Sequence, residues 1–271
     1  MRFHRLCVVV LALSGSAGQA TAEVIDYDTT IDYTIEEEIG VFEGANPNPP
    51  TIVNVVEPAT IGGIAAADSS VVNVYGGRIV STGDDADEAV IATDTGVVNF
   101  FGGEVISNFE ALATFGHGTI NVYDGLFRSW VDAEEYGTIN IFGGSFEGPI
   151  IAGDTEAQIH IHGGNIPRLE VGEWCQMTVY GTGFNYPYGP IPDDAGVLTG
   201  VLSNGQAINA EFNIDKTYSE NVSIVLAMPE PSTFAMLATS AVGLFFMVRR
   251  HHRRPGHSRK TLHAIPKKVA T

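Results

Sequence analysis

Hydrophobic and polar residues alternate in six short stretches of this chain, and each stretch ends at a glycine turn. The first copy reads VNVYGG at residues 72–77, and the others occupy residues 98–103, 120–125, 139–144, 159–164 and 177–181. Successive side chains of a β-strand point to opposite faces, so the alternation predicts strands with one apolar and one polar face. The apolar face is formed by Val72, Val74, Val98, Phe100, Ile120, Val122, Ile139, Ile141, Ile159, Ile161, Met177 and Val179.

The copies recur at the spacing of solenoid coils. Equivalent polar residues stand at positions 73, 99, 121, 140, 160 and 178, in steps of 26, 22, 19, 20 and 18 residues. A second apolar position follows each glycine pair, at Ile79, Val105, Phe127, Phe146 and Ile166. A third apolar stretch precedes the next copy, at residues 89–92, 111–114, 130–133, 150–152 and 169–171. Three apolar stretches per coil predict a triangular parallel β-helix.

The sequence thus predicts an all-β fold, a short parallel β-solenoid of about six coils over residues 71–184. Residues 23–70 are expected to hold an N-terminal cap and a degenerate coil, in which Asn54 stands 19 residues before Asn73. Residues 185–227 are expected to form a C-terminal β cap, because Asn204 and Gly205 between two alternating stretches are a strong hairpin signal. A cap would protect the open sheet edges of the last coil.

Both ends of the chain carry features of export. Residues 1–22 combine two arginines, an apolar run and small residues before Glu23, which is the pattern of a cleaved signal peptide. Near the other end, residues 228–254 contain Pro229-Glu230-Pro231, an uncharged apolar stretch at 234–248 and a basic cluster. The apolar stretch predicts a hydrophobic helix that resides in the membrane, with the arginines on the cytoplasmic side.

The order of motif, apolar helix and basic cluster resembles the PEP-CTERM sorting signal, and the repeats resemble secreted β-helix proteins. The first resemblance implies recognition and cleavage near Pro229, Glu230 and Pro231 by an exosortase-type membrane peptidase. It also implies delivery from an inner-membrane intermediate to the cell surface or the extracellular polysaccharide matrix. The signal normally ends at its basic cluster, whereas here a further basic tail follows at residues 255–271.

The charge of the chain is distributed unevenly. Between residues 23 and 228 there are four Lys and Arg and 31 Asp and Glu, a formal charge of 4 minus 31, or −27. Such a field repels phosphate groups, so we expect no nucleic-acid partner. Within the exported part Cys175 is the only cysteine, which excludes an internal disulfide there.

The polar face of the predicted strands carries two columns of side chains. These are Asn73, Asn99, Asn121 and Asn140, and beside them Tyr75, Phe101, Tyr123 and Phe142, with His160, His162 and Tyr180 continuing the pattern. Stacked asparagines and rings stabilise any ladder of parallel strands, which is the structural interpretation. The alternative is a glycan-binding face on which the rings pack against sugars.

Two metal sites are conceivable from the sequence. The insert at residues 81–88 contains Asp84, Asp85, Asp87 and Glu88, whose oxygens suit calcium, but their spacing matches no known calcium loop and favours a solvated acidic loop. His160 and His162, two positions apart on one strand, would offer two ligands to a metal, but no third ligand is evident. We expect no other cofactor.

A polysaccharide lyase or glycoside hydrolase is the alternative to a non-catalytic role. Such enzymes need two carboxylates at a set separation, or a base beside calcium and a cationic group. Arg78, Arg128 and Arg168 follow different glycine turns and would align on one edge, yet no copy clusters Asp with Arg. Ice binding would need ranks of Thr-x-Thr, which the copies do not supply. The sequence therefore favours an exported, non-catalytic solenoid with a structural, adhesive or glycan-associated role.

Overall fold

The computed structural model describes residues 23–42, 50–82, 88–153, 156–172, 174–216 and 222–229. All regular structure in these residues is β, and they belong to one compact unit that ends at Pro229. The expected signal peptide at residues 1–22 and the expected apolar helix at residues 234–248 lie outside the described residues. Within the part described, no helix is long and apolar enough to cross a membrane.

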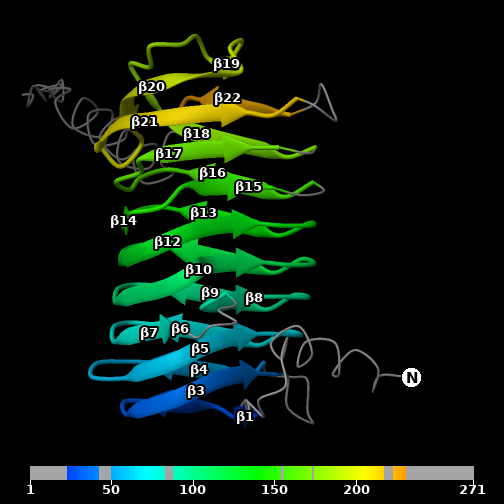
Figure 1. The fold of residues 1–271 in the computed structure, drawn as a ribbon, viewed down its shortest axis with the longest axis vertical. Coiled ribbons are helices and arrows are strands. Elements are labelled where there is room, and N and C mark those ends of the chain that lie inside the picture. The colour runs from blue at the N-terminus through cyan, green and yellow to red at the C-terminus, as the bar shows by residue number, and fades with distance from the viewer. Residues whose placement is uncertain are drawn as a thin grey trace, which may run out of the picture. The chain divides into compact units, whose positions relative to one another are not determined.

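The alternating strands form one parallel sheet, wall 1, to which each coil adds one strand (Figure 1). Pairing is in register, with Asn73 opposite both Asn54 and Asn99. The six copies found in the sequence are successive strands of this wall, and three further strands extend it. In order the strands are β2 (Thr29–Ile31), β4 (Ile52–Val55), β6 (Val71–Val74), β9 (Val97–Phe100), β11 (Thr119–Val122), β13 (Thr138–Ile141), β16 (Gln158–Ile161), β18 (Gln176–Thr182) and β22 (Ser223–Ala227).

Two more walls complete each coil, as three apolar stretches per coil predict. Wall 2 follows the glycine turn and consists of the first parts of β3 (Thr34–Val41), β5 (Thr60–Ala66), β10 (Glu104–Thr114) and β12 (Leu126–Ala133), with β7 (Arg78–Ser81) and β14 (Ser145–Phe146). Wall 3 consists of the second parts of β3, β5, β10 and β12, with β1 (Glu23–Ile25), β8 (Val90–Ala92), β15 (Ile150–Ala152), β17 (Arg168–Val171) and β21 (Ala207–Ile214). The prediction of a three-walled parallel β-solenoid is confirmed.

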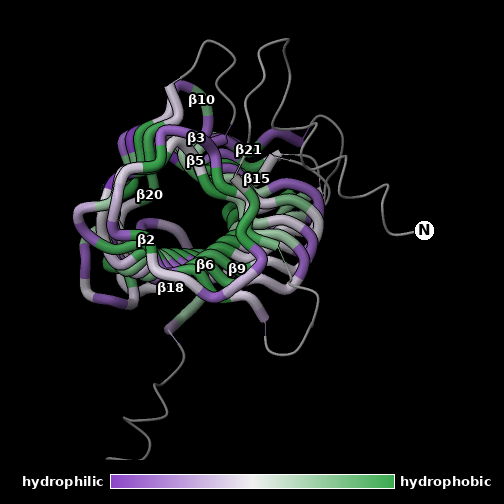
Figure 2. Tube along the Cα trace, turned by 90° about the horizontal axis from the view of Figure 1, so that it is seen from below, coloured by the Kyte–Doolittle hydropathy of each residue, from purple (hydrophilic) through white to green (hydrophobic). Residues whose placement is uncertain are grey.

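The core is the stack of inward side chains from the three walls. All twelve apolar residues assigned to the inner face of wall 1 are buried, Val74 and Phe100 at 1% exposure and the others at 0%. Wall 2 adds Phe127 and Phe146, whose ring centroids lie 4.9 Å apart, and Phe127 also packs edge-on against Phe100. Seen along the stack, the coils superimpose around one interior (Figure 2). Each coil buries its apolar side chains mainly against its neighbours, so the coils stabilise one another.

The corner between walls 1 and 2, here called the glycine corner, needs its glycines for two different reasons. The second glycine of the pair has a positive φ, 88° at Gly77 and 108° at Gly103, which is costly for other residues. The first glycine lies against the preceding coil, since a Cβ on Gly143 would stand 2.2 Å from the carbonyl oxygen of Tyr123. The glycine turn thus follows from both backbone conformation and coil spacing.

The largest differences in coil length are absorbed at the corner between walls 2 and 3, here called the variable corner. From the buried residue of wall 2 to that of wall 3 the chain takes eleven residues at Ile79 to Val90, but only four at Phe127 to Val131. By contrast, the distance from wall 3 to the next wall 1 polar residue is nine residues both at Val90 to Asn99 and at Val131 to Asn140. Long variable corners therefore do not change the register in which the strands of successive coils pair.

The two ends of the unit differ in how they continue this pattern. Thr29–Ile31 and Thr34–Val41, where the sequence suggested a capping strand, pair in parallel with the next coil and form a further coil of the same kind. At the other end, β20 (Ala195–Leu202) and β21 form the predicted antiparallel hairpin. β19 (Gly189–Pro190) is also antiparallel, to β22, so antiparallel pairing occurs at this end.

The hairpin turn folds onto the glycine corner of the last coils. The backbone N–H of Asn204 donates to the carbonyl of His162 over 3.0 Å, and its side-chain Nδ2 donates to the carbonyl of Phe142 over 3.1 Å. The N–H of Gly164 donates to Oε1 of Gln206 over 2.6 Å. Backbone groups that a further coil would pair with are thereby satisfied by the turn.

Candidate functional site

Five asparagines form a hydrogen-bonded ladder along the outer face of wall 1. At each step, Nδ2 of one asparagine donates to Oδ1 of the asparagine in the preceding coil. The distance is 3.1 Å from Asn73 to Asn54 and 2.9 Å at Asn99, Asn121 and Asn140. The ladder contains the four asparagines predicted from the sequence and adds Asn54. It is partly buried, and its amides are engaged with one another.

Six rings form a second column beside the asparagines. Consecutive centroids lie 4.2–5.1 Å apart, and the ring planes are within 4–16° of parallel. The column consists of Tyr75, Phe101, Tyr123, Phe142, His162 and Tyr180. This spacing follows directly from the separation of strands in a parallel sheet.

The stacking decides what the ring column offers to solvent. Tyr75, Phe101 and Tyr123 are 54%, 42% and 45% exposed, so the column is accessible. However, each ring within it has a neighbouring ring against both faces, which leaves only its edge toward solvent. Sugars pack against ring faces, and these faces are taken up inside the column. The geometry therefore favours the structural interpretation of these residues over a pyranose-stacking platform.

His160 and His162 occupy equivalent places in the two columns but differ in their contacts. His162 stacks between Phe142 and Tyr180, whereas His160 stands opposite Asn140, at the end of the asparagine ladder. Nδ1 of His160 is buried and has no hydrogen-bond partner among the described residues. Burial lowers the pKa of both histidines, and the charge of His160 lowers that of His162 further. The structure places no third metal ligand beside them in the part of the chain it describes.

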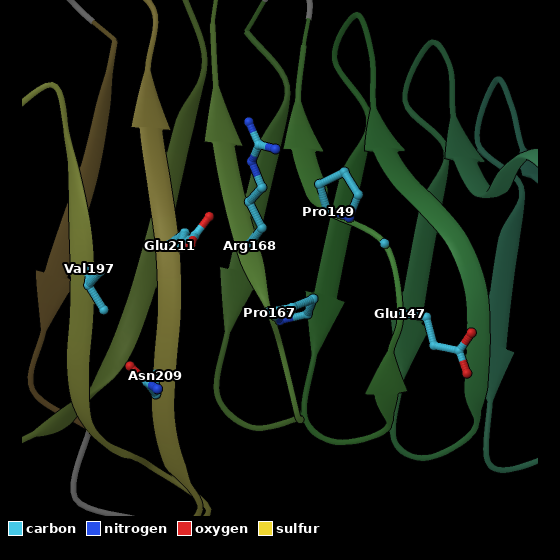
Figure 3. A pocket seen from close by; sticks show the side chains of 8 residues that line it. Glu147, Pro149, Pro167, Arg168, Val197, Asn209 and Glu211 are labelled. Carbon is cyan, nitrogen blue, oxygen red and sulfur yellow. The ribbon is translucent and has the colours of Figure 1, made fainter.

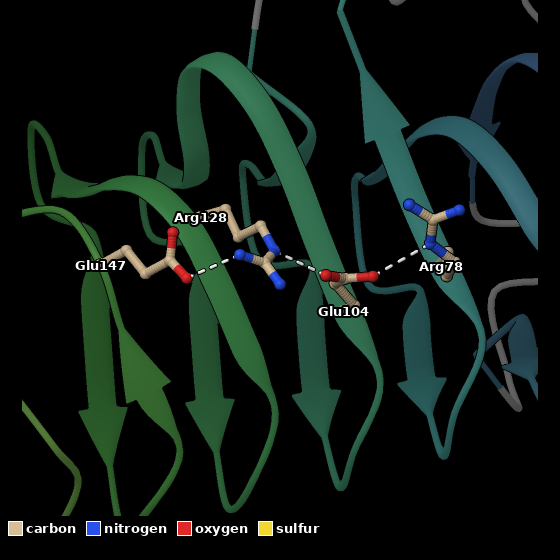
Figure 4. A network of polar contacts seen from close by, with 4 residues as sticks. All are labelled: Arg78, Glu104, Arg128 and Glu147. Atoms are coloured by element: carbon tan, nitrogen blue, oxygen red, sulfur yellow. Dashed lines mark hydrogen bonds and ion pairs between the residues drawn. The ribbon is translucent and has the colours of Figure 1, made fainter.

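Of the three arginines expected to align on one edge, Arg78 and Arg128 lie in wall 2 and share an ion-pair network (Figure 4), whereas Arg168 lies in β17 of wall 3. Glu104 accepts from Nε of Arg78 over 3.0 Å and from Nε of Arg128 over 2.6 Å, and Arg128 also pairs with Glu147 over 2.7 Å. The hydrogen bond from Arg128 is the main cause that lowers the pKa of Glu104. Each cation of this row is thus bound to carboxylates of its own chain.

The other two basic side chains of the described unit are paired as well. Arg168 contacts Glu170 over 2.7 Å, and Lys216 contacts Asp194. A lyase of the kind considered above needs a cationic group directed at its substrate. Each of the four basic residues between 23 and 229 instead has an acidic partner.

One cleft of about 600 Å³ lies where the last coils meet the hairpin (Figure 3). It is open and is lined by Glu147, Gly148, Pro149, Pro167, Arg168, Val197, Asn209 and Glu211. In Figure 3, Glu147 stands at the opposite end of the cleft from Val197 and Asn209. Glu147 and Arg168 already have ion-pair partners, so the polar groups of the cleft do not converge on one point.

A cluster of carboxylates at the variable corner was not predicted from the sequence. Oxygens of Glu110, Asp132 and Glu134 all lie within 4.8 Å of one another. Glu110 is only 4% exposed, and burial, followed by the charges of Asp132, Glu88 and Glu134, raises its pKa to about 8. The available signal was a lone acid in the sequence FEALA at residues 109–113. The expected apolar stretch began one residue after Glu110 and therefore passed over it.

Two sets of predicted site residues fall largely outside the described part of the chain. Asp84, Asp85 and Asp87 of the acidic insert lie outside it, whereas Glu88 lies inside and contributes its charge to Glu110. Of the sorting motif, Pro229 is described, while Glu230 and Pro231 are outside. Calcium binding by the insert and recognition of the motif stay predictions.

The chain was compared with known proteins at three levels. No protein-family model matches it. No curated protein and no solved structure matches it significantly.

Proposed function

We propose that this protein is an exported β-solenoid with a structural, adhesive or glycan-associated role at the cell surface or in the extracellular matrix. The observation that carries the proposal is the order of features at residues 228–254: Pro229-Glu230-Pro231, an uncharged apolar stretch and a basic cluster. An exosortase-type peptidase would cleave near the motif after residues 234–248 halt export in the membrane. The arginines would hold the end in the cytoplasm.

The surface of the solenoid supports a non-catalytic role. Its two repeated outer columns are occupied by contacts between coils, and its basic side chains are paired with acids. An enzyme needs groups that are directed at a substrate rather than at each other. A stack of coils with an acidic surface instead suits a spacer or matrix component, which needs stability and solubility.

The hairpin would act as a C-terminal cap in this role. β21 pairs in parallel with β17 of the last coil, while β20 turns back antiparallel along it. An exposed parallel edge would invite pairing with another molecule, and a hairpin that also satisfies the glycine corner removes part of that edge. The protein would therefore stay discrete instead of polymerising through this end.

The proposal is tested by following the tail in a host that has the sorting peptidase. The wild-type protein is expected to lose residues beyond the motif and to leave the membrane fraction. Changing Pro229, Glu230 and Pro231 to alanine is expected to keep the intact protein in the membrane, whereas Pro255→Ala, beyond the basic cluster, should process normally. Recovery of surface protein that still carries residues 261–271, measured by mass spectrometry, would contradict the proposal.

Cleavage of polysaccharides is the second candidate, favoured only by the cleft with Glu147 and Glu211. We expect no reducing ends and no unsaturated products when residues 23–227 are incubated with a panel of acidic and neutral polysaccharides. If either product forms, Glu147→Gln and Glu211→Gln identify the carboxylate that is required. A glycan array on the same protein separates binding without cleavage from both outcomes.

A further inference from the structure

The carboxylates at the variable corner come from two successive coils. Glu110 lies in β10, Asp132 lies in β12 of the next coil, and Glu134 follows two residues later. β10 and β12 pair in parallel, but the register shifts on both sides of Glu110. A bulge of this kind changes the direction of a side chain relative to the regular strand. It is thus the break in the repeat that brings Glu110 to the acids of the following coil.

The long variable corner of the preceding coil brings a further acidic residue, Glu88, close to Glu110. The coil before β10 has the longest such corner, and Glu88 at its end lies near enough for its charge to raise the pKa of Glu110. In coils with a four-residue corner no equivalent insert exists. Three carboxylates therefore meet where two long corners follow one another, within reach of the charge of Glu88.

Glu110 lacks the contacts that normally stabilise a buried acid. Its side chain is 4% exposed, and its Oε2 atom is buried without a hydrogen-bond partner among the described residues. The arginines nearest in sequence, Arg78 and Arg128, are bound to Glu104 and Glu147 instead. A buried carboxylate beside further carboxylates is unfavourable unless a positive charge or a proton joins it.

We propose that Glu110, Asp132 and Glu134 bind a divalent cation, and that this cation is calcium. Hard cations prefer carboxylate oxygens, and calcium binds them at about 2.3–2.6 Å, so opposite ligands stand at most about 5 Å apart. The three carboxylate oxygens, all within 4.8 Å of one another, fit inside such a sphere. Magnesium instead demands a near-ideal octahedron at about 2.1 Å and gives up its waters reluctantly, whereas calcium accepts a less regular set of carboxylate oxygens.

A cation at this position would join two coils on the outside of wall 3. Its ligands belong to β10 and to the chain of the next coil, which elsewhere are held together by backbone hydrogen bonds and the apolar core. Binding to the folded chain alone raises the apparent stability of the fold by mass action. The site is separate from the sorting signal and does not depend on the proposed function.

The proposal is tested on residues 23–229 freed of metal with a chelator. Calorimetric titration with calcium chloride is expected to show one site, and millimolar calcium should raise the melting temperature by about 5 °C. Magnesium chloride at the same concentration should give a smaller rise. Glu110→Gln should abolish both the titration signal and the temperature shift, while Glu211→Gln, an exposed acid on the hairpin, should leave both unchanged.

Two further variants make every outcome informative. Glu110→Gln is expected to remain folded without calcium, as judged by circular dichroism, because glutamine has nearly the same shape as the protonated acid and carries no charge. Glu134→Gln should weaken calcium binding at least tenfold if the cluster is the site. Changing Asp84, Asp85 and Asp87 together to Asn should leave a titratable site. Calcium binding that survives Glu110→Gln and Glu134→Gln, or no binding in the wild type, would overturn the proposal.

Discussion

On the outer face of wall 1, polar side chains at equivalent positions bond to one another from coil to coil, whereas at the variable corner polar side chains meet without repeating. The ladder from Asn54 to Asn140 uses one residue type in one register, and each amide finds its partner in the neighbouring coil. The cluster of Glu110, Asp132 and Glu134 brings together like charges from unrelated positions.

The contrast teaches where a solenoid can hold a ligand site. A repeated position has the same neighbour above and below, so a side chain that suits this neighbour is satisfied within the fold. A position made by a bulge has no equivalent residue in the neighbouring coil, and Oε2 of Glu110 is buried there without a hydrogen-bond partner among the described residues. We infer that ligand sites of this protein are to be sought where the coils differ in length, not along the columns that are most conspicuous in the sequence.

The largest effect on stability is expected from a charge placed in the apolar core. Val74 is 1% exposed in wall 1, so Val74→Asp places an unpaired carboxylate in the core at a cost of several kcal/mol and should prevent folding. Val197→Asp makes the same change at a residue of β20 that is 45% exposed and should fold. Circular dichroism of both variants checks this, and a folded Val74→Asp would contradict the assignment of the inner face.

The next effect concerns pH and the carboxylate cluster. With calcium removed, the folded chain holds a proton on Glu110 up to a pKa of about 8, whereas in the unfolded chain this pKa is near 4.5. The free energy of unfolding should therefore fall as pH rises from about 4.5 to about 8, in total on the order of 5 kcal/mol. Burial is the main cause of this raised pKa, and the charges of Asp132, Glu88 and Glu134 add to it.

Urea unfolding in a chelating buffer at several pH values measures this dependence. Glu110→Gln should flatten it between pH 5 and 8, because the group that takes up the proton is gone. Glu211→Gln serves as the matched control and should retain the slope. An unchanged slope in Glu110→Gln would show that another group holds the proton.

A smaller effect is expected within the ladder. Asn121 donates to Asn99 and accepts from Asn140, so Asn121→Ala removes two side-chain hydrogen bonds and should cost about 1–2 kcal/mol. Asn54→Ala removes the one bond that Asn54 accepts from Asn73 and should cost about half as much. Urea unfolding midpoints compare the two variants. Equal losses of stability would contradict the prediction that each hydrogen bond of the ladder contributes to the stability of the fold.

The smallest expected effect is an increase in stability. His160 stands opposite Asn140, and its buried Nδ1 lacks a partner among the described residues, so His160→Asn would add a rung to the ladder at a gain of about 1 kcal/mol. Because burial lowers the pKa of His160, the wild type should lose stability as pH falls below about 6.5, and the variant should lose less. Unfolding at pH 7 and pH 5.5 measures both, with His117→Asn as the control.

The walls could be read from the sequence because strand alternation has a fixed period of two. Val72 and Val74 therefore specify the inner face, and Gly76 with Gly77 specifies the corner that follows. The first coil was missed because Thr29–Val41 has no glycine pair and its apolar residues, such as Ile35 and Ile39, alternate only briefly. A coil is recognised in the sequence by its corner as much as by its strands.

The sites were less predictable because alternation assigns a face and not a contact. It placed Tyr75 and Phe101 outward but gave no indication that their planes would lie 9° from parallel, with the rings stacked face to face. Glu110 was missed because its position depends on a bulge in β10, which shifts the register over a few residues. Bulges depend on pairing with the neighbouring coil, and that information is spread over two distant segments.

The in-register pairing of successive coils also means that the gene can gain or lose whole coils. Thr119 stands opposite Thr138, so a gene duplication of the 19 residues from Thr119 to Gly137 would insert one complete turn and return every later residue to its own wall. An insertion one residue longer within a wall would turn each following side chain to the wrong face. Descendants of this gene are therefore expected to differ in length by whole turns, and in smaller steps at the corners between the walls and not within them.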